Sequence, residues 1–220
     1  MFLIMSRIRY IIFDFDGTIA DTIDLALAIY NRISPEYNCK AVNYEDRKVL
    51  REGKPKELLK EYGVTNLKLG LLLLRIRKEI GNHIPELKLV KGIRDPLREI
   101  KNAGLNLGIL TSNSTHNVNR FLKKNDLTDI LDFVYRGKSL FGKDRVLMRL
   151  FDHEKISGEE VMYIGDETRD IEASERAGIP VIAVTWGLNS RKALLSLKPD
   201  QIADKPSDLP GCVQEVLLKN

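Results

Sequence analysis

The stretch Ile8-Arg9-Tyr10-Ile11-Ile12-Phe13 is mostly apolar and rich in β-prone residues, and it leads directly into two carboxylates, Asp14 and Asp16. Successive side chains of a strand point to opposite faces of a sheet, so apolar residues at consecutive positions predict a strand buried on both faces. Gly17 comes next and allows the chain to turn out of the strand. A pair of like charges at the end of a buried strand indicates that a cation is held there.

Helical spacing of the apolar residues replaces this pattern after Thr18. The segment Asp21–Asp24 resembles a capping arrangement before a helix that Ser34-Pro35 ends. Asn43 is expected to cap a second helix to Leu50, and Pro55 to begin a third helix closed by Gly63. A fourth helix runs from Asn66 through Ile80 and ends at Gly81. Because no strand-like alternation occurs between residues 20 and 87, we expect this segment to be a helical insertion.

Strands and helices alternate from Leu87 onwards. Predicted strands cover 105–110, 132–135, 161–164, 180–184 and 201–203, and predicted helices cover 95–104, 115–125, 143–153, 170–177 and 209–218. Such alternation predicts an α/β fold, a doubly wound parallel sheet. We therefore expect a catalytic core formed by 1–19 and 88–220, with a small helical cap, 20–87, inserted after the first strand.

Composition and charge limit the classes of molecule that this protein is expected to bind. A hydrophobic content of 43% and a charged content of 30% are typical of a soluble globular domain. The net charge of +4 is small, and the basic residues are scattered, which argues against a nucleic-acid partner. Leu69–Leu74 is too short to span a membrane. Cys39 and Cys212 are isolated thiols without metal-ligand spacing, so we expect a reducing, cytoplasmic compartment.

Polar residues follow four of the predicted strands, at the edge where an open α/β sheet carries its active site. Asp14 and Asp16 follow the first, and Thr111-Ser112-Asn113 ends the second and precedes a helix N-terminus, a natural anion site. Gly142-Lys143 follows the third, and Asp166 and Asp170 follow the fourth. Singly, each group has an ordinary structural alternative as a turn, a helix cap or a solvated charge. Together, and in this order, they indicate one site.

The chemistry of this set is consistent with phosphoryl transfer. Three or four carboxylates share a site only around a cation, and hard oxygen ligands suit Mg²⁺. Lys143 and the helix end at Thr111 and Ser112 would hold an anionic substrate group against the metal. Phosphoryl transfer needs a positioned nucleophile, charge neutralisation and a proton donor for the leaving oxygen.

These motifs are similar to those of the haloacid dehalogenase-like hydrolase superfamily, in its phosphoglycolate phosphatase-like branch. Asp14-Phe15-Asp16-Gly17-Thr18-Ile19-Ala20-Asp21 resembles the first motif of that family, and Thr111-Ser112-Asn113 resembles the second. Lys143 resembles the third motif, and Gly165-Asp166 with Asp170 the fourth. The third motif of this branch commonly reads Gly-Lys-Pro, whereas Asp144 follows the lysine here. The resemblance covers the core nearly from end to end.

The resemblance implies a Rossmann-like core and a role for each residue. Asp14 would attack phosphorus to form an aspartyl-phosphate, and Asp16 would protonate the leaving alcohol and then activate water. Asp14, the backbone carbonyl of Asp16, and Asp166 would hold Mg²⁺, with Asp170 orienting its waters or Lys143. The transferring phosphoryl group would be bound by Thr111, Asn113 and Lys143, beside Ser112. The acid at position 16 favours a phosphatase over a dehalogenase.

Three functions stay open at this point. The first is a Mg²⁺-dependent phosphatase, monomeric or homodimeric, that acts on a small phosphorylated metabolite such as phosphoglycolate or a sugar phosphate. The second is a phosphomutase with the same aspartyl-phosphate, and the third is an inactive binding or scaffold protein on this fold. In the insertion, Arg51 or Lys54 is a candidate for binding the distal group of the substrate, the alternative being a solvated loop.

Overall fold

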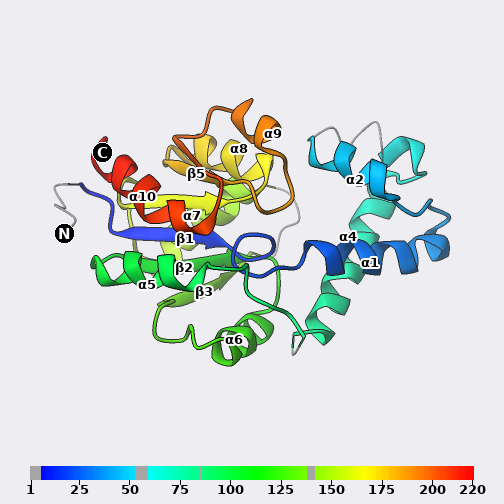
Figure 1. Cartoon of the computed structure of the whole chain (residues 1–220), viewed down its shortest axis with the longest axis horizontal. Helices are drawn as coiled ribbons and strands as arrows, with labels where there is room; N and C mark the ends of the chain where they lie inside the picture. Colours follow the sequence, from blue (N-terminus) through cyan, green and yellow to red (C-terminus); the bar gives the residue numbers. More distant parts are fainter. Residues whose placement is uncertain (1–5, 53–58, 85, 138–141) are drawn as a thin grey trace.

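The computed structural model describes residues 6–52, 59–84, 86–137 and 142–220, and its centre is a parallel sheet (Figure 1). The described strands lie in the order β3-β2-β1-β4-β5-β6. Their bounds are β1 Tyr10–Asp14, β2 Asn106–Thr111, β3 Phe133–Arg136, β4 Val161–Gly165, β5 Val181–Val184 and β6 Gln201–Ala203. This order confirms the predicted doubly wound parallel sheet and places β1 between β2 and β4.

The register of β1 sets the position of the site. Asp14 lies opposite Leu110 of β2, and Phe13 lies opposite Ile164 of β4. Because all these strands run in the same direction, the residues that follow β1, β2 and β4 leave the sheet at one edge. The polar residues that the sequence places after these strands therefore lie at the same end of the molecule.

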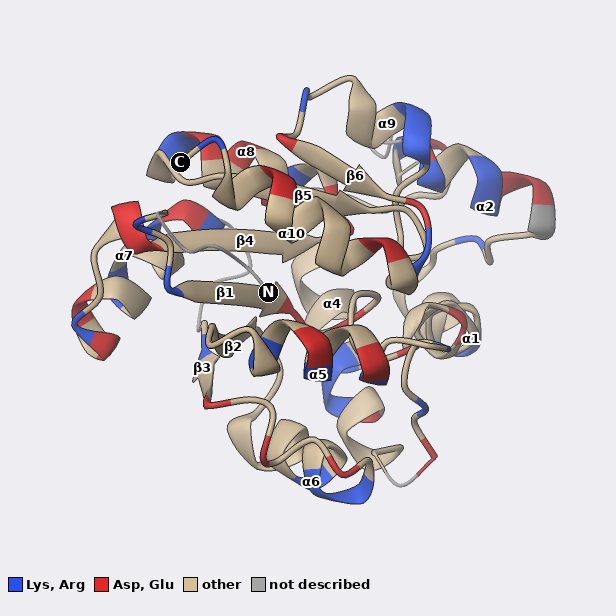
Figure 2. Cartoon of the chain, turned by 60° about the vertical axis from the view of Figure 1, so that its left-hand side comes forward, with Lys and Arg blue, Asp and Glu red and all other residues tan. Residues whose placement is uncertain are grey.

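Two layers of helices cover the sheet (Figure 2). Ile11 and Phe13 of β1 belong to one apolar cluster and Ile12 to the other, as expected from the alternation of side chains along a strand. The first cluster includes side chains of α5 (Arg94–Asn102), α6 (Thr115–Lys124) and α10 (Leu209–Leu217). The second includes side chains of α7 (Lys143–Glu154), α8 (Thr168–Ala177) and α9 (Arg191–Leu195). Short 3₁₀ turns cover Ser34–Tyr37, Gly158–Glu160 and Pro206–Asp208.

The helices between β1 and α5 lie beyond the carboxyl end of β1 (Figure 1). They include α1 (Ile23–Ile33), α2 (Tyr44–Arg51) and α4 (Asn66–Asn82). Their apolar side chains continue the first cluster, through Ile29 and Ile33 of α1 and Leu72 of α4. The helical character predicted for this segment is confirmed in its described part, where Asn43 caps α2 through a reciprocal pair of hydrogen bonds with Asp46.

The chain enters and leaves this helical segment side by side. Ala20 forms an antiparallel bridge with Leu89. The N–H of Asp21 donates to the carbonyl of Lys88 at 3.0 Å, and the N–H of Val90 donates to the carbonyl of Ile19 at 2.9 Å. The two connections are thus tied to each other at the edge of the sheet.

Some local expectations were wrong. Thr22 precedes α1, but its side chain makes no capping hydrogen bond there. Helix α8 begins at Thr168, so Asp170 lies inside its first turn, where its carboxylate accepts from the N–H of Glu167 at 3.1 Å. The five-residue helix α9 has too few residues to show a periodic pattern. Pro55 lies outside the described residues. Among the helices that are described, none is both long and apolar enough to cross a bilayer.

Candidate active site

Asp14 ends β1 and is almost fully buried, with 7% of the residue exposed. Its Oδ1 accepts the N–H of Phe15 at 2.7 Å, and its Oδ2 accepts the Nζ of Lys143 at 2.8 Å. The first contact fixes the rotation of the carboxylate, and the second pairs it with an ammonium ion. A carboxylate held in this way presents an oxygen in a defined direction at the end of the central strand.

Lys143 is the first residue of α7, directly after Gly142, whose φ of +78° favours glycine. Its Nζ also donates to Asp170 Oδ1 at 2.5 Å and lies 4.9 Å from the centre of the Tyr163 ring. Burial disfavours the ammonium form, but the charges of Asp14 and Asp170 outweigh it and hold the pKa of Lys143 well above its usual value. The lysine is therefore a fixed cation on the floor of the site.

Asp14, Asp166 and Asp170 each place one carboxylate oxygen within 4.8 Å of the others. Burial, together with the charges of Glu167 and Asp14, raises the pKa of Asp166 well above its usual value. Burial also raises the pKa of Asp170 to about 6, although Lys143 opposes the shift. The ammonium group of Lys143 neutralises only one of these three carboxylates when all are ionised. A hard divalent cation such as Mg²⁺ fits this oxygen donor set.

Asp166 is enclosed by contacts that fix its orientation. Its Oδ1 accepts the hydroxyl of Thr18 and its Oδ2 accepts the N–H of Leu188, both at 2.7 Å. A Cβ atom added at Gly17 or Gly187 would lie only 2.4 Å or 2.1 Å from Asp166 Oδ2, so both positions require glycine. The motif that begins at Asp14 and the loop after β5 are thus built around Asp166.

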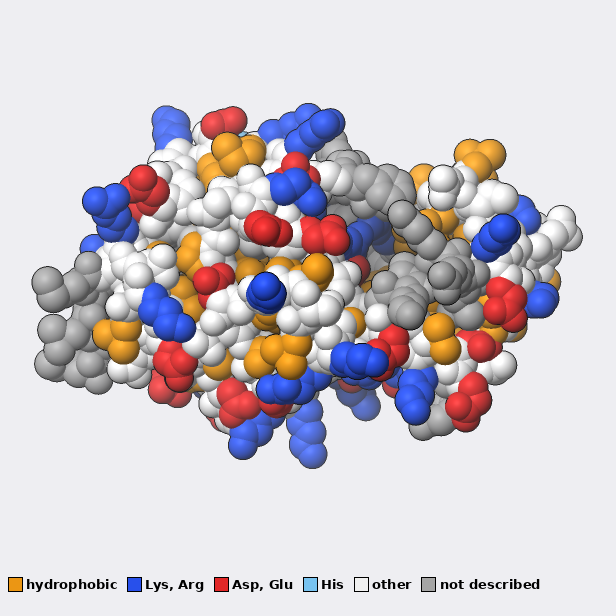
Figure 3. Space-filling model, turned by 90° about the horizontal axis from the view of Figure 1, so that it is seen from above, with side chains coloured by type: hydrophobic (Ala, Val, Ile, Leu, Met, Phe, Trp, Pro, Cys, Tyr) orange, Lys and Arg blue, Asp and Glu red, His pale blue; other side chains and the backbone are white. Residues whose placement is uncertain are grey.

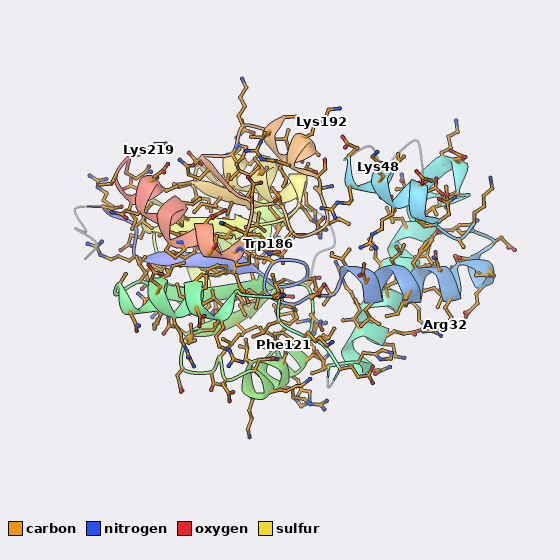
Figure 4. All side chains as sticks on the ribbon, in the orientation of Figure 1. Arg32, Lys48, Phe121, Trp186, Lys192 and Lys219 are labelled. Atoms are coloured by element: carbon orange, nitrogen blue, oxygen red, sulfur yellow. The ribbon has the colours of Figure 1, made fainter. Side chains whose placement is uncertain are left out.

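The loop after β5 contacts both Asp166 and the helical segment. Trp186 lies beside the end of β1 and donates its Nε1–H to the carbonyl of Thr18 at 3.1 Å (Figure 4). Asn189 accepts the N–H of Thr168 through its side chain at 2.8 Å, and its own N–H donates to the carbonyl of Asp166 at 3.2 Å. These polar contacts of Trp186 and Asn189 join residues far apart in the chain, so they are visible only in the folded protein.

The segment after β2 provides the expected hydroxyl groups. Thr111 is buried, and its Oγ1 accepts the N–H of Asn113 at 3.0 Å. Asn113 Oδ1 accepts the N–H of Ser114 at 2.8 Å and the Nδ2–H of Asn117 at 3.2 Å. Thr111 and Ser112 line the same cavity as Asp14 and Lys143. Below this segment, Phe121 packs edge-on against Phe15, with 5.1 Å between ring centres (Figure 4).

Asp16 differs from the other acids in its surroundings. Its carboxylate is not one of the three clustered groups, so a contribution of Asp16 to a metal site would come from its backbone carbonyl. Its Oδ1 is buried and has no hydrogen-bond partner within the described part of the chain. Burial, followed by the negative charge of Asp14, raises the pKa of Asp16 to about 6. This carboxyl group therefore exchanges protons near neutral pH.

The variant Asp16→Asn is expected to stabilise the metal-free protein more at pH 8 than at pH 5. Because the pKa of Asp16 is higher in the folded state than in the unfolded state, its contribution to folding stability is fully present below the unfolded value of 3.8. That contribution is lost as the pH rises through the folded value of about 6. Asparagine does not titrate, so the difference in unfolding free energy between the variant and the wild type should increase by about 1 kcal/mol from pH 5 to pH 8. Urea denaturation in EDTA at both pH values measures it. An equal gap at both would contradict the assigned shift.

A cavity of about 250 Å³ opens above these groups. Besides Asp14, Thr111, Ser112 and Lys143, its lining includes Arg77 of α4, which sequence reasoning did not single out. The sequence offers little to single it out, because α4 also carries Lys68, Arg75 and Lys78, and which of these basic side chains faces the core depends on how the helix packs.

The residues expected to bind the distal group of the substrate are placed differently. Arg51 donates through its guanidinium to the carbonyl of Thr185 at 3.2 Å, and its own carbonyl accepts the N–H of Ser190 at 2.7 Å. It therefore joins α2 to the loop after β5, and it is not among the described residues that line the cavity above Asp14. Lys54 lies outside the described residues.

Comparison with known proteins supports an enzymatic assignment. A sequence model of the family described as haloacid dehalogenase-like hydrolase matches residues 11–184. The phosphoglycolate phosphatase of Synechococcus elongatus is 35% identical over 207 residues, which cover 94% of this chain and 98% of that protein. The pyrophosphatase PpaX of Bacillus cereus is 27% identical, over 92% of this chain and 95% of its own length.

Solved structures agree with the fold. A haloacid dehalogenase-like hydrolase of Streptococcus pneumoniae superimposes with a TM-score of 0.75 at 24% identity, covering 94% of this chain and 99% of its own. CbbY of Rhodobacter sphaeroides, solved in complex with phosphate, superimposes with a TM-score of 0.66 at 20% identity, covering 92% and 96%.

Proposed function

Because the chain belongs to the haloacid dehalogenase-like hydrolase family, we propose that it is a phosphatase for a small phosphate monoester, with phosphoglycolate as the first candidate substrate. The relative from Synechococcus elongatus, which aligns over nearly the whole of both chains, carries the name of that activity. The PpaX relatives share less identity, so inorganic pyrophosphate is the second substrate to test. The substrate is a small metabolite of the cytoplasm, and the enzyme acts as a monomer or a homodimer.

One observation carries this proposal. The Nζ of Lys143 lies 2.8 Å from Asp14 and 2.5 Å from Asp170, at the floor of a cavity that Thr111 and Ser112 also line. A carboxylate at the end of the central strand is thereby placed next to a cation and hydroxyl donors. These are the groups that phosphoryl transfer needs to position and neutralise an incoming phosphate.

The roles of the side chains follow from this placement. A carboxylate oxygen of Asp14 forms a bond to phosphorus as the bond between phosphorus and the leaving oxygen breaks. Asp16, with a pKa of about 6, donates a proton to the leaving alcohol and then accepts one from the water that releases phosphate from Asp14. Lys143 and Thr111 bind the phosphoryl oxygens, together with Ser112 and Asn113.

The three clustered carboxylates, Asp14, Asp166 and Asp170, fit a Mg²⁺ ion by their oxygen donors and by their shortage of positive charge. Asp14, Asp166 and the backbone carbonyl of Asp16 would hold it, and Asp170 would hold Lys143. Bound there, the ion would neutralise the charge of the phosphoryl group. The hydroxyl of Thr18 and the N–H of Leu188 hold Asp166 in position at this site.

Residues 20–87 act as a cap over the catalytic core formed by 1–19 and 88–220. The polar contacts between Arg51 and the loop after β5 support a docked cap. Asn189 of that loop contacts both parts, because its Nδ2–H donates to the carbonyl of Arg51 at 3.4 Å and its N–H donates to the carbonyl of Asp166 at 3.2 Å. A docked cap excludes bulk water from the cavity and strengthens the electrostatic interactions within it.

Phosphate release from phosphoglycolate, pyrophosphate and para-nitrophenyl phosphate tests this function. Turnover is expected with Mg²⁺ and is expected to be abolished by EDTA and restored by added Mg²⁺. A phosphatase releases inorganic phosphate, whereas a phosphomutase forms an isomeric phosphate ester, so the products distinguish the two activities. A folded protein that turned over no phosphate ester in the presence of Mg²⁺ would leave a binding or scaffold function.

A further inference from the structure

Arg77 is a charged side chain of α4 that faces the cavity above Asp14. The residue is half-buried, and its guanidinium makes no hydrogen bond or ion pair with any residue that the structure describes. Arg75, on the same helix, is different: it is exposed and donates to Glu79 at 2.7 Å. Of these two arginines, the one directed at the cavity lacks a protein partner.

The other cations of the cavity are already engaged. Lys143 pairs with two aspartates, Arg169 pairs with Glu167, and Arg176 lies 3.5 Å from Asp144. Burial, followed by the nearby charge of Arg169, lowers the pKa of Arg77, and the charges of Asp16, Glu167 and Asp14 only partly oppose the shift. Lys and Arg side chains are visible in the hollow between the core and the helical segment (Figure 3).

A guanidinium removed from water without a partner is unfavourable, and an anion supplied by a ligand removes that cost. The cavity has a volume of about 250 Å³, and Arg77 and Lys143 both line it. A ligand of this size carries few atoms besides its phosphoryl group. An anionic group bound by Arg77 would therefore be separated from that phosphoryl group by only a short carbon chain or a bridging oxygen.

We propose that Arg77 is a specificity-determining residue that binds a second anionic group, a carboxylate, of a short-chain phosphate monoester whose phosphoryl group lies at Asp14 and Lys143. The proposal rests on the phosphatase function proposed above. It replaces Arg51, whose guanidinium is bound to the loop after β5, as the cap residue that selects the substrate. A phosphoryl group at the same position, as in pyrophosphate, is the alternative source of the anion.

The test compares phosphoglycolate with ethylene glycol monophosphate, in which a neutral hydroxymethyl group replaces the carboxylate. Arg77→Gln is expected to lower kcat/KM for phosphoglycolate by about 10–100-fold, mostly through KM, because a charge-assisted contact is lost. The same variant should change kcat/KM for ethylene glycol monophosphate by less than about threefold. Arg77→Lys should restore part of the loss, and Arg75→Gln, on the same helix, should leave both substrates unaffected.

An equal loss for both esters, or no loss for either, would overturn the role of Arg77. Pyrophosphate is assayed in parallel, and a loss confined to pyrophosphate would identify a phosphoryl group instead of a carboxylate and overturn the proposal as stated. Calorimetric titration of both esters into the wild type and Arg77→Gln separates this proposal from the phosphatase function. If neither ester is hydrolysed but the variant loses binding of phosphoglycolate alone, the phosphatase function fails and the role of Arg77 stands.

Discussion

Asp14→Asn is expected to lower turnover of every phosphate ester by at least about a thousandfold, because a neutral amide does not attack phosphorus. The fold should persist, since asparagine has the same shape and its carbonyl oxygen is able to accept the N–H of Phe15. Steady-state phosphate release in the presence of Mg²⁺ measures the loss. Acid quenching with radiolabelled substrate should trap label on the wild type and none on the variant.

Asp21→Asn is the matched control, because Asp21 is exposed and follows the same strand. It should retain wild-type activity and melting temperature. Turnover by Asp14→Asn above about a tenth of the wild-type rate, with protein shown to be free of deamidated Asp14, would rule out this residue as the nucleophile. A shared loss in both variants would point to a general effect of removing charge near β1.

Lys143→Met is expected to destabilise the metal-free protein by about 3 kcal/mol and to raise KM strongly. The substitution leaves Asp14 and Asp170 buried without the ammonium ion that neutralises them, and methionine fills a similar volume. Mg²⁺ should recover a larger share of stability in the variant than in the wild type, since the ion would replace part of the missing charge. Urea denaturation in EDTA and in Mg²⁺ measures both effects.

Lys219→Met serves as the control, because Lys219 is an exposed lysine of the C-terminal end, far from the site (Figure 4). Its stability should match that of the wild type in both buffers. If Lys143→Met were as stable as the wild type in EDTA, the lysine would not be the principal counter-ion of the acids. If its KM were unchanged, Lys143 would not bind the phosphoryl group.

Most of the fold could be predicted from the sequence because its signals are local. Continuous apolar runs such as 10–13 and 161–164 are typical of parallel strands buried on both faces, and helical spacing between them defines the layers. Thr22 shows the limit of local patterns: a residue type that commonly caps helices precedes α1 but makes no cap. Helix α9, with five residues, is shorter than the window of about 11 residues in which a helical period is recognised.

Some residues of the candidate site could be predicted from local patterns in the sequence, and others could not. Its acids and Lys143 follow strands of the core, so the order of strands was sufficient to predict that they meet. Arg77 and Arg51 could not be distinguished from the sequence, because both are basic residues in the helical segment. Which one faces the cavity depends on how that segment packs onto the core, through contacts between residues as distant in the chain as Arg51 and Thr185.

The antiparallel bridge between Ala20 and Leu89 has a consequence for how such a chain diversifies. The helical segment is a long loop whose ends are neighbours in the core, and the entropy of closing it grows only with the logarithm of its length, about 0.6 kcal/mol for each doubling. Lengthening, shortening or exchanging the segment therefore costs the core little and leaves β1 in place. With the role proposed for Arg77, the residue that selects the substrate lies in this exchangeable segment, whereas Asp14 and Lys143 lie outside it.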